Sequence, residues 1–287
     1  MAPTAASGDD DSCLLLLCIE TNPSFWESTS PTLGVETVQD VGLVAFMQHL
    51  LVFINAFVLL HTSNHLVVCA LHSDGCHLLY QSPQLQLAQD GGAGAAADLT
   101  AAPSSVVAAR LGELPQGGTS ASPTPLSGGL SRVLSYAHRA MMRDTVTGAP
   151  QQARILCMHG STDSPRQYVA TMNAIFCAQN MRIPIDVCLL GPHESPFLQQ
   201  AASLTGGLYM RPPRPRALAQ YLITVFSPDP LSRTALRLPQ AKGVDFRASC
   251  FCHKRALDIG FVCSVCLSIY CAQCKECATC GAEYTDT

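Results

Sequence analysis

The hydrophobic positions of this chain fall into short and long runs that alternate, and this alternation predicts alternating strands and helices. Short apolar runs bounded by turn residues are typical of buried strands, and they occur at residues 11–20, 65–71, 77–81, 154–159, 183–190 and 208–210. Longer segments predict helices at residues 36–62, 126–146, 166–179, 197–205 and 217–226. The tripeptide Ser73-Asp74-Gly75 separates two of the short runs and predicts a hairpin turn.

The order of these elements predicts an α/β fold with a mostly parallel sheet that helices cover on both faces. We expect this domain to span residues 11–228. Residues 89–125 are rich in Ala, Gly, Ser and Pro, so they predict a low-complexity loop with a short helix near residues 106–111. Prolines make residues 229–243 a predicted linker, and residues 244–287 are then a separate small module.

Residues 41–60 form a stretch that is long and apolar enough to resemble a transmembrane span. Its interior carries Gln48, His49 and Asn55, which a lipid-facing helix disfavours. Neither flank has a Lys or Arg residue that would set a membrane topology. A helix buried in the α/β core is the favoured interpretation, and a membrane-associated protein stays the alternative.

The composition excludes several classes of protein. Of the 287 residues, 48% are hydrophobic and 13% are charged, about half the charged share of an ordinary soluble protein, which excludes a chain that is disordered throughout. Ten acidic and no basic residues precede Arg110, whereas 17 basic and 11 acidic residues follow from there on. The balance is not that of a dedicated nucleic-acid binder. The basic stretch at residues 211–216 is therefore interpreted as a solvated loop or partner contact, with nucleic-acid binding as the alternative.

The 15 cysteines are unevenly distributed, because eight of them lie between Cys250 and Cys280. Three aspartates precede the first apolar run, so we expect no secretory signal and therefore reduced thiols. Two Cys-x-x-Cys pairs, Cys263/Cys266 and Cys277/Cys280, are separated by ten residues. This spacing suits a tetrahedral Zn²⁺ ion, and four thiolates leave no open position for water. We expect a structural zinc site whose metal supplies much of the module's folding free energy.

Four more cysteines of this region, Cys250, Cys252, Cys271 and Cys274, are candidates for a second metal site. The two sites would be interleaved, as in cross-braced RING-like modules. The alternatives are that some of these cysteines are buried thiols beside the first site, or that His253 replaces one of them as a ligand.

In an open α/β sheet, ligands bind at the carboxyl ends of the strands. The first predicted strand ends in Glu20-Thr21-Asn22-Pro23-Ser24, where a von Willebrand factor A domain carries an Asp-x-Ser-x-Ser metal motif. Glu20 and Asn22 depart from that motif and Ser24 matches it. Thr124 and Asp163 are expected near the same edge. We favour a vestigial loop used in packing or partner contact over a Mg²⁺ site, because the longer Glu disturbs the compact octahedral geometry.

The sequence contains no G-x-x-x-x-G-K-[ST] loop, no G-x-S-x-G elbow and no H-E-x-x-H motif. Cys157 and Cys188 lie inside predicted strands, which is typical of buried hydrophobic thiols rather than nucleophiles. We therefore expect a protein that is not an enzyme, with no catalytic residues.

Several segments resemble the von Willebrand A-type subunits of general transcription factor IIH. The resemblance is carried by LLCIETNPSFW at the end of the first strand, by YVATMNAIFCAQ and LQQAASLTGGLY, and most specifically by VDFRASCFCHKRALDIGFVCSVCLSIYC. It covers most of the chain and implies a von Willebrand factor A-like domain with a zinc-binding module. The family's zinc site carries over to Cys263, Cys266, Cys277 and Cys280. Cys274 is an addition to the family pattern, which weakens the case for a second metal site.

The same resemblance implies a non-catalytic scaffold in the nucleus, in the core of a complex that acts in RNA polymerase II transcription initiation and nucleotide excision repair. Its expected partner is another subunit with a zinc-binding C-terminal region, which regulates a helicase. Neither a small-molecule substrate nor a membrane is implied. The alternative function is a RING-like ubiquitin-ligase module attached to an A domain.

Overall fold

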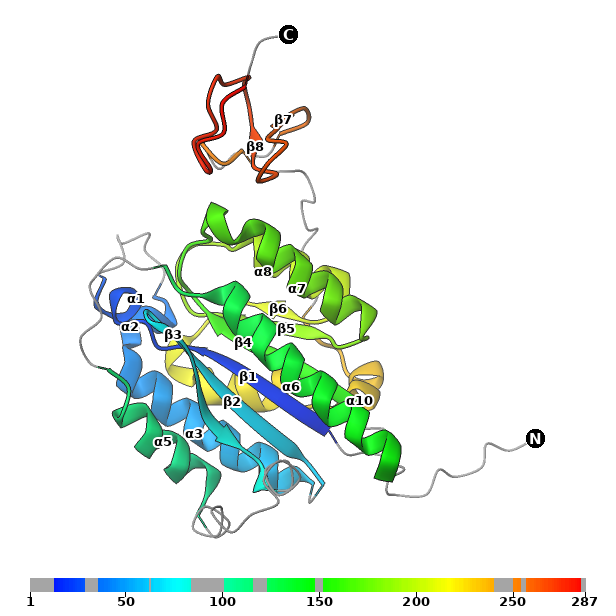
Figure 1. Cartoon of the computed structure of the whole chain (residues 1–287). Coiled ribbons are helices and arrows are strands. Elements are labelled where there is room, and N and C mark those ends of the chain that lie inside the picture. The colour runs from blue at the N-terminus through cyan, green and yellow to red at the C-terminus, as the bar shows by residue number, and fades with distance from the viewer. Residues whose placement is uncertain are drawn as a thin grey trace.

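A six-stranded sheet organises most of the chain in this computed structural model, which describes residues 13–28, 36–61, 63–83, 101–115, 123–147, 152–239, 250–253 and 257–284. The strand order is β3-β2-β1-β4-β5-β6, and all neighbours are parallel except the β2/β3 hairpin (Figure 1). The strands are β1 (Cys13–Glu20), β2 (His65–His72), β3 (Gly75–Gln81), β4 (Gln152–His159), β5 (Ile185–Leu189) and β6 (Tyr209–Met210). The expected von Willebrand factor A-like α/β fold is confirmed.

The central strand β1 is buried on both faces, which explains its uninterrupted apolar sequence. Because side chains alternate along a strand, Leu15 and Leu17 enter the core on one face of the sheet. Leu14 and Leu16 enter the core on the other face. A strand that lines two cores at once has no position for a polar side chain until it reaches the edge at Glu20.

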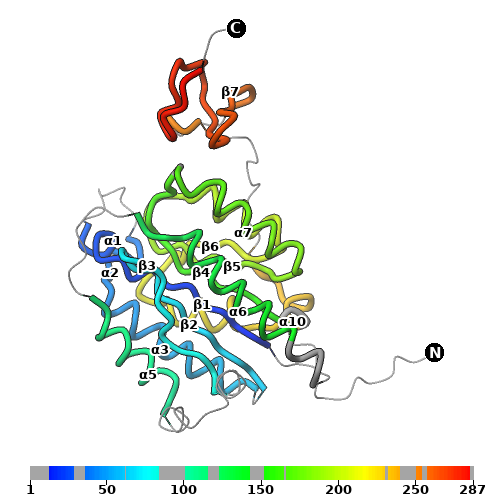
Figure 2. The backbone as a smooth tube through the Cα atoms, viewed as in Figure 1, coloured from blue at the N-terminus to red at the C-terminus, as the bar shows by residue number. Residues whose placement is uncertain are grey.

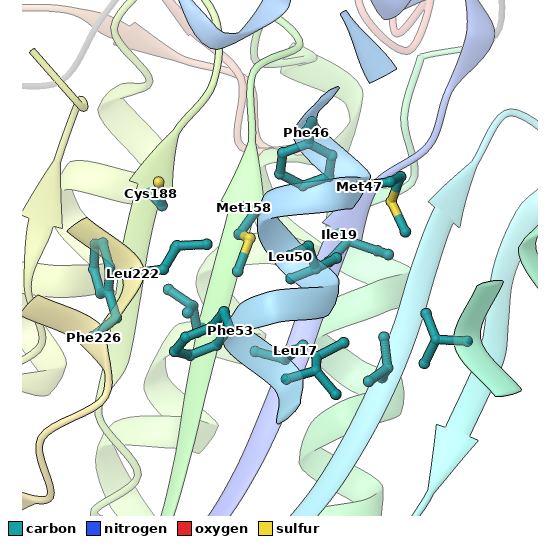
Figure 3. Close-up of a cluster of buried hydrophobic side chains, with 14 of the residues drawn as sticks. Leu17, Ile19, Phe46, Met47, Leu50, Phe53, Met158, Cys188, Leu222 and Phe226 are labelled. Atoms are coloured by element: carbon teal, nitrogen blue, oxygen red, sulfur yellow. The ribbon is translucent and has the colours of Figure 1, made fainter. Parts of the chain in front are cut away.

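One face of the sheet is covered by α3 (Leu43–Leu60), α5 (Pro103–Gly112), α9 (Leu218–Tyr221) and the π-helical segment η3 (Leu222–Phe226). Figure 3 shows how Phe46, Leu50 and Phe53 of α3 lie between the helix and the strands, with Leu222 and Phe226 beside them. The opposite face is covered by α6 (Leu126–Thr147), α7 (Tyr168–Asn180) and α8 (Pro196–Thr205) (Figures 1 and 2). The short helix predicted near residues 106–111 is confirmed as part of α5.

The helix expected over residues 36–62 is interrupted, which corrects the sequence prediction. It consists of α2 (Val38–Val41) and α3, and Gly42 separates them with a φ of 91°. Glycine tolerates this left-handed region without a steric cost. Asp40 closes a capping box with Thr37 at the start of α2. A further short helix, α1 (Pro23–Glu27), follows β1 and is absent from the sequence prediction.

Helix α3 is the one described helix that is long and apolar enough to cross a membrane, with a mean hydropathy of 2.2. Six of its side chains nevertheless lie in the core beneath it, namely Phe46, Met47, Leu50, Phe53, Ile54 and Phe57. The apolar character of this helix is therefore used, at least on one face, to bury the sheet.

The predicted linker at residues 229–243 begins with a helix rather than with irregular chain. This helix, α10 (Pro230–Ala235), carries Arg233, which donates through Nη1 and Nη2 to both carboxylate oxygens of Asp186 on β5 at 2.8 and 2.5 Å. The bidentate ion pair attaches this segment to the sheet. Residues 240–243 of the predicted linker lie outside the described residues. The small module beyond them contains the antiparallel pair β7 (Phe261–Val262) and β8 (Ile269–Tyr270). The described residues also include the 3₁₀ turns η1 (Pro165–Gln167) and η2 (Pro215–Ala217).

A fully buried arginine forms hydrogen bonds with the carbonyl groups at the end of η3. Arg154 of β4 donates to the carbonyl oxygens of Phe226, Ser227 and Pro228 at 2.7, 2.6 and 2.8 Å. The last carbonyls of a helix lack partners within the helix. The guanidinium satisfies them here, and it lies 5.6 Å from the centre of the Phe57 ring.

We predict that Arg154→Met lowers the free energy of unfolding by about 2–3 kcal/mol, because three carbonyl groups lose a charged donor while the aliphatic volume is kept. Chemical denaturation of the full chain measures this difference. Arg237→Met is the matched control, since Arg237 is exposed and its loss is expected to change stability by less than about 0.5 kcal/mol. Equal effects of the two substitutions would contradict the prediction.

Candidate metal centres

The side chain of Glu20 lies at the carboxyl edge of the sheet and is completely buried. Its Oε2 atom lies 2.5 Å from Nδ1 of His159, at the end of the neighbouring strand β4. Its Oε1 atom accepts hydrogen bonds from the hydroxyls of Ser161, at 2.9 Å, and Thr124. The backbone N–H groups of Gly160 and Ser161 also point to Oε2, each at 3.3 Å. The carboxylate is thus surrounded by donors of the chain itself.

The other candidates from the sequence are also engaged in internal contacts. The Asn22 amide donates to the hydroxyl of Thr124 at 3.0 Å, and its oxygen accepts from the Ser24 N–H at 3.1 Å as the N-cap of α1. Asp163 accepts from the hydroxyl of Ser195 and the N–H of Phe197, at 2.6 and 3.1 Å, at the start of α8. The structure therefore brings Glu20, Asn22 and Thr124 together at this edge. Asp163 caps α8 and also lies close enough to His159 to raise the pKa of that side chain.

These residues do not fit a Mg²⁺ ion of the von Willebrand factor A type. Such a site needs free carboxylate and hydroxyl oxygens around the cation, but here the imidazole of His159 occupies the position beside the buried carboxylate. Burial disfavours both charges, and their mutual attraction outweighs it. The pKa of Glu20 is consequently lowered by the charge and hydrogen bond of His159, and the pKa of His159 is raised by Glu20 and, to a lesser extent, by Asp163.

Sequence reasoning did not single out His159. The available signal was its position as the last residue of the predicted strand at residues 154–159, next to the small residues Gly160 and Ser161. A sequence does not reveal that this histidine meets Glu20, because 138 residues lie between the two in the chain.

The four cysteines of the predicted zinc site converge in the C-terminal module. The sulfur atoms of Cys263, Cys266, Cys277 and Cys280 all lie within 4.8 Å of one another. The Cys263–Cys280 and Cys266–Cys277 distances are 3.7 and 3.5 Å. A tetrahedral Zn²⁺ with Zn–S bonds of about 2.3 Å separates its sulfur ligands by about 3.8 Å, so this donor set fits zinc.

The two Cys-x-x-Cys turns have the same backbone construction. The residue after the second cysteine of each turn has a left-handed conformation, with a φ of 59° at Leu267 and 72° at Gly281. In the first turn the N–H groups of Val265 and Cys266 point to the Cys263 sulfur at 3.4 and 3.5 Å. Backbone N–H groups directed at a sulfur atom favour its thiolate form, which is the form that binds metals.

A second group of donors lies in the same module. It consists of the sulfur atoms of Cys250, Cys252 and Cys271 and the Nδ1 atom of His253, all within 4.8 Å of one another. Cys274, which the sequence suggested as a member, is not in this group and packs instead beside the small cluster of Cys263, Tyr270 and Cys277. His253 takes the fourth position, which was the alternative considered.

The buried core of the module is very small. Only Cys263, Tyr270 and Cys277 among its described residues form a buried apolar cluster, with Phe251, Cys266, Cys274, Ala282 and Tyr284 packed partly against it. Cysteine side chains make up half of this set. Such a core buries too little apolar surface to fold a module of this size alone.

The other candidates from the sequence are the thiols of Cys157 and Cys188 and the basic stretch at residues 211–216. Burial raises the pKa of the Cys188 thiol to about 12 and also raises the pKa of Cys157, so neither is a reactive thiolate. In the basic stretch, Arg211 pairs with Glu194 at 2.8 Å and Arg216 with Glu36 at 3.0 Å. These ion pairs support the interpretation of a solvated loop over nucleic-acid binding.

The Glu20–His159 pair predicts a specific pH dependence of stability. The pKa of His159 is higher in the folded state than its unfolded value near 6.5. Protonated His159 therefore stabilises the fold fully below pH 6.5, and this stabilisation is lost as the pH rises through the folded pKa. The pKa of Glu20 is lower in the folded state than its unfolded value near 4.5. Charged Glu20 therefore stabilises the fold fully above pH 4.5, and this stabilisation is lost as the pH falls through the folded pKa. We predict that His159→Asn, which keeps a donor but removes the charge, destabilises the chain most between about pH 4.5 and 6.5 and less at higher pH.

Denaturant unfolding of the wild type and of His159→Asn across this pH range measures the effect. His193→Asn is the matched control, because His193 is exposed. A stability loss in His159→Asn that is constant from pH 5 to 9 would refute a charged pair.

Comparison with known proteins identifies the family. The family model of transcription factor Tfb4 matches residues 12–281. The chain is 40% identical to the general transcription and DNA repair factor IIH subunit TFB4 of Arabidopsis thaliana, over 96% of this chain and 90% of that protein. It is 36% identical to the corresponding Schizosaccharomyces pombe subunit, with the same coverage. The crystal structure of the TFIIH p34 N-terminal domain superposes with a TM-score of 0.58 and 28% identity, covering 75% of this chain and 97% of that one. The chain therefore belongs to the Tfb4 family of general transcription and DNA repair factor IIH subunits.

Proposed function

We propose that this protein is a non-catalytic scaffold in the core of transcription factor IIH. It acts in RNA polymerase II transcription initiation and nucleotide excision repair by binding another zinc-bearing subunit of the complex, which regulates a helicase. The names of its relatives support membership of this complex, and such a role places the protein in the nucleus.

The observation that carries the proposal is an exposed apolar surface on the cysteine-rich module. We call it the hairpin patch, and it consists of Ile259, Phe261, Val262, Val265 and Leu267. All five lie within nine residues and are at least 47% exposed. A small module that leaves this much apolar surface in contact with water is typical of an interaction site. The low charge of the chain also suits surfaces that partners cover.

The chemistry of the two candidate centres supports a role in assembly. At the sheet edge, the Glu20 carboxylate is satisfied by His159, Thr124 and Ser161, so it offers no free oxygen for a cation or a substrate. In the module, Cys263, Cys266, Cys277 and Cys280 form a closed donor set, so a Zn²⁺ ion held there has no open position for catalysis. The bound metal would stabilise the turns that present the hairpin patch.

The alternative of a RING-like ubiquitin ligase has one observation in its favour, which is that the two donor groups interleave along the chain. A ligase also requires a surface that binds a conjugating enzyme, and discharge of ubiquitin from such an enzyme is the direct assay. Release of ubiquitin stimulated by this chain would favour the alternative, and no stimulation would eliminate it.

The test of the proposal is affinity purification of the full chain followed by mass spectrometry of the copurifying subunits. We predict recovery of the helicase subunits and of a second zinc-bearing subunit. Ile259→Glu is expected to weaken the association by roughly 10- to 100-fold, because burying a large aliphatic side chain contributes about 1.5–3 kcal/mol. Leu59→Glu on α3 is the matched control, because Leu59 is 84% exposed and Ile259 is 85% exposed. It should retain the association, since Leu59 lies outside the hairpin patch.

Zinc content is measured in both variants to verify that the module is folded. Purification of the wild-type chain without any subunit of the complex would overturn the proposal. Equal losses in the two variants would show that the hairpin patch is not the main contact.

A further inference from the structure

The second donor group has the dimensions of a metal site. The Nδ1 atom of His253 lies 3.1 Å from the sulfur of Cys252, 3.4 Å from that of Cys271 and 3.9 Å from that of Cys250. The sulfur atoms of Cys252 and Cys271 are 3.6 Å apart. For a tetrahedral Zn²⁺ ion, bonds of about 2.3 Å to sulfur and 2.0–2.1 Å to nitrogen give ligand separations of about 3.8 Å for two sulfurs and 3.6 Å for sulfur and nitrogen.

A metal ion accounts for all four of these donors, whereas a disulfide accounts for two. A Cys252–Cys271 disulfide would leave the positions of Cys250 and His253 without a cause, and all three cysteines are free. Core packing does not account for the group either, because Cys252, His253 and Cys271 are exposed and only Cys250 is buried. Three thiolates with one imidazole are a soft and closed donor set of the kind that selects zinc.

We propose that Cys250, Cys252, His253 and Cys271 bind a second structural zinc ion, in addition to the ion expected at the four-cysteine site. This proposal does not depend on the identity of the partner subunit, because it concerns the metal content of the chain alone. The ion closes the start of the module onto its hairpin, since three ligands come from residues 250–253 and the fourth follows β8.

The two sites lie at opposite ends of the β7/β8 hairpin. Cys263 follows β7 directly at the end where the chain turns, and Cys271 follows β8 directly at the open end. Along the sequence, the ligands of the second site at residues 250–253 and 271 alternate with the ligands of the four-cysteine site at residues 263–266 and 277–280. This interleaving couples the two ions, because neither end of the hairpin can separate while both are bound.

The second ion also has a role between the module and the A domain. Phe251 lies between two of its ligands, and its N–H donates to the Ile269 carbonyl at 2.9 Å. The Phe251 ring packs edge-on against Tyr168 of α7, with ring centres 5.5 Å apart, and Tyr168 in turn packs on Phe197 of α8. A metal that fixes residues 250–253 therefore holds the aromatic side chain that contacts the A domain. The second zinc therefore stabilises the contact between the module and the A domain.

The metal content of the purified full chain tests the proposal. We expect two zinc ions per chain in the wild type, measured by plasma mass spectrometry, and one in Cys271→Ser. Cys274→Ser is the matched control and should keep both ions, because Cys274 lies in the same module but outside both donor groups. One ion in the wild type, or the loss of an ion in Cys274→Ser but not in Cys271→Ser, would overturn the proposal.

A spectroscopic variant distinguishes loss of a ligand from loss of folding. Cobalt-substituted wild type should show d–d absorption from one four-sulfur and one three-sulfur, one-nitrogen centre. His253→Cys should keep two ions and convert the second spectrum to the four-sulfur type. An unchanged cobalt spectrum in His253→Cys would contradict the assignment of His253 as a ligand.

Hydrogen exchange tests the role of the second ion in the contact between the module and the A domain. Phe251→Ala should keep both ions but increase amide hydrogen exchange around Tyr168, whereas Cys252→Ser should cause the same increase and lose one ion. Unchanged exchange around Tyr168 in Cys252→Ser would overturn this part of the proposal.

Discussion

The contact between Glu20 and His159 determines what the carboxyl edge of this sheet is able to do. The two residues end the central strands β1 and β4, which pair in parallel over most of their length. A carboxylate that is buried without a positive partner costs several kcal/mol, so holding Glu20 in its charged form requires a compensating positive charge. A divalent metal is one solution to that requirement. In this chain the imidazolium of His159 is the solution, and the hydroxyls of Thr124 and Ser161 complete the shell.

The cysteine-rich module faces the opposite constraint, because it has too little apolar surface rather than too much buried charge. Its described core is three side chains, two of which are cysteines. The two groups of clustered metal donors therefore offer the main means of holding this part of the chain together. The two donor groups explain why the module retains short strands and tight turns without a larger core. They also explain why its apolar residues are free to lie on the surface.

The α/β core was largely predictable from the sequence, because its central strands β1, β2, β4 and β5 are buried on both faces and have nearly continuous apolar sequences. The break at Gly42 was not, since the apolar pattern continues across it and the required φ is a property of the backbone alone. Helix α10 was missed for a related reason. Pro228 and Pro230 suggested a linker, but a proline at the first position of a helix is favourable, and Arg233 anchors that helix through a tertiary contact with Asp186.

The two candidate metal centres also differ in how far the sequence predicts them. Two Cys-x-x-Cys pairs predict their own site, because each pair is a local turn that presents two sulfurs together. Residues 250–253 contain no such pair, and the spacing does not decide whether Cys274 or His253 completes their group. That choice depends on where β8 places Cys271, which is a property of the folded hairpin. Likewise, the partner of Glu20 depends on the register of β1 and β4, which no local pattern encodes.

The placement of charge and metal in this molecule follows one logic. At the sheet edge, the charge of Glu20 is neutralised by the internal His159, so this carboxylate needs no outside cation. In the module, the donor groups are complete and leave no open coordination position. Among the described residues, exposed large apolar side chains gather on the hairpin patch of the module and on the outer face of α3. Exposed apolar surface of this kind is typical of protein–protein interfaces, which is why the proposed role is one of assembly.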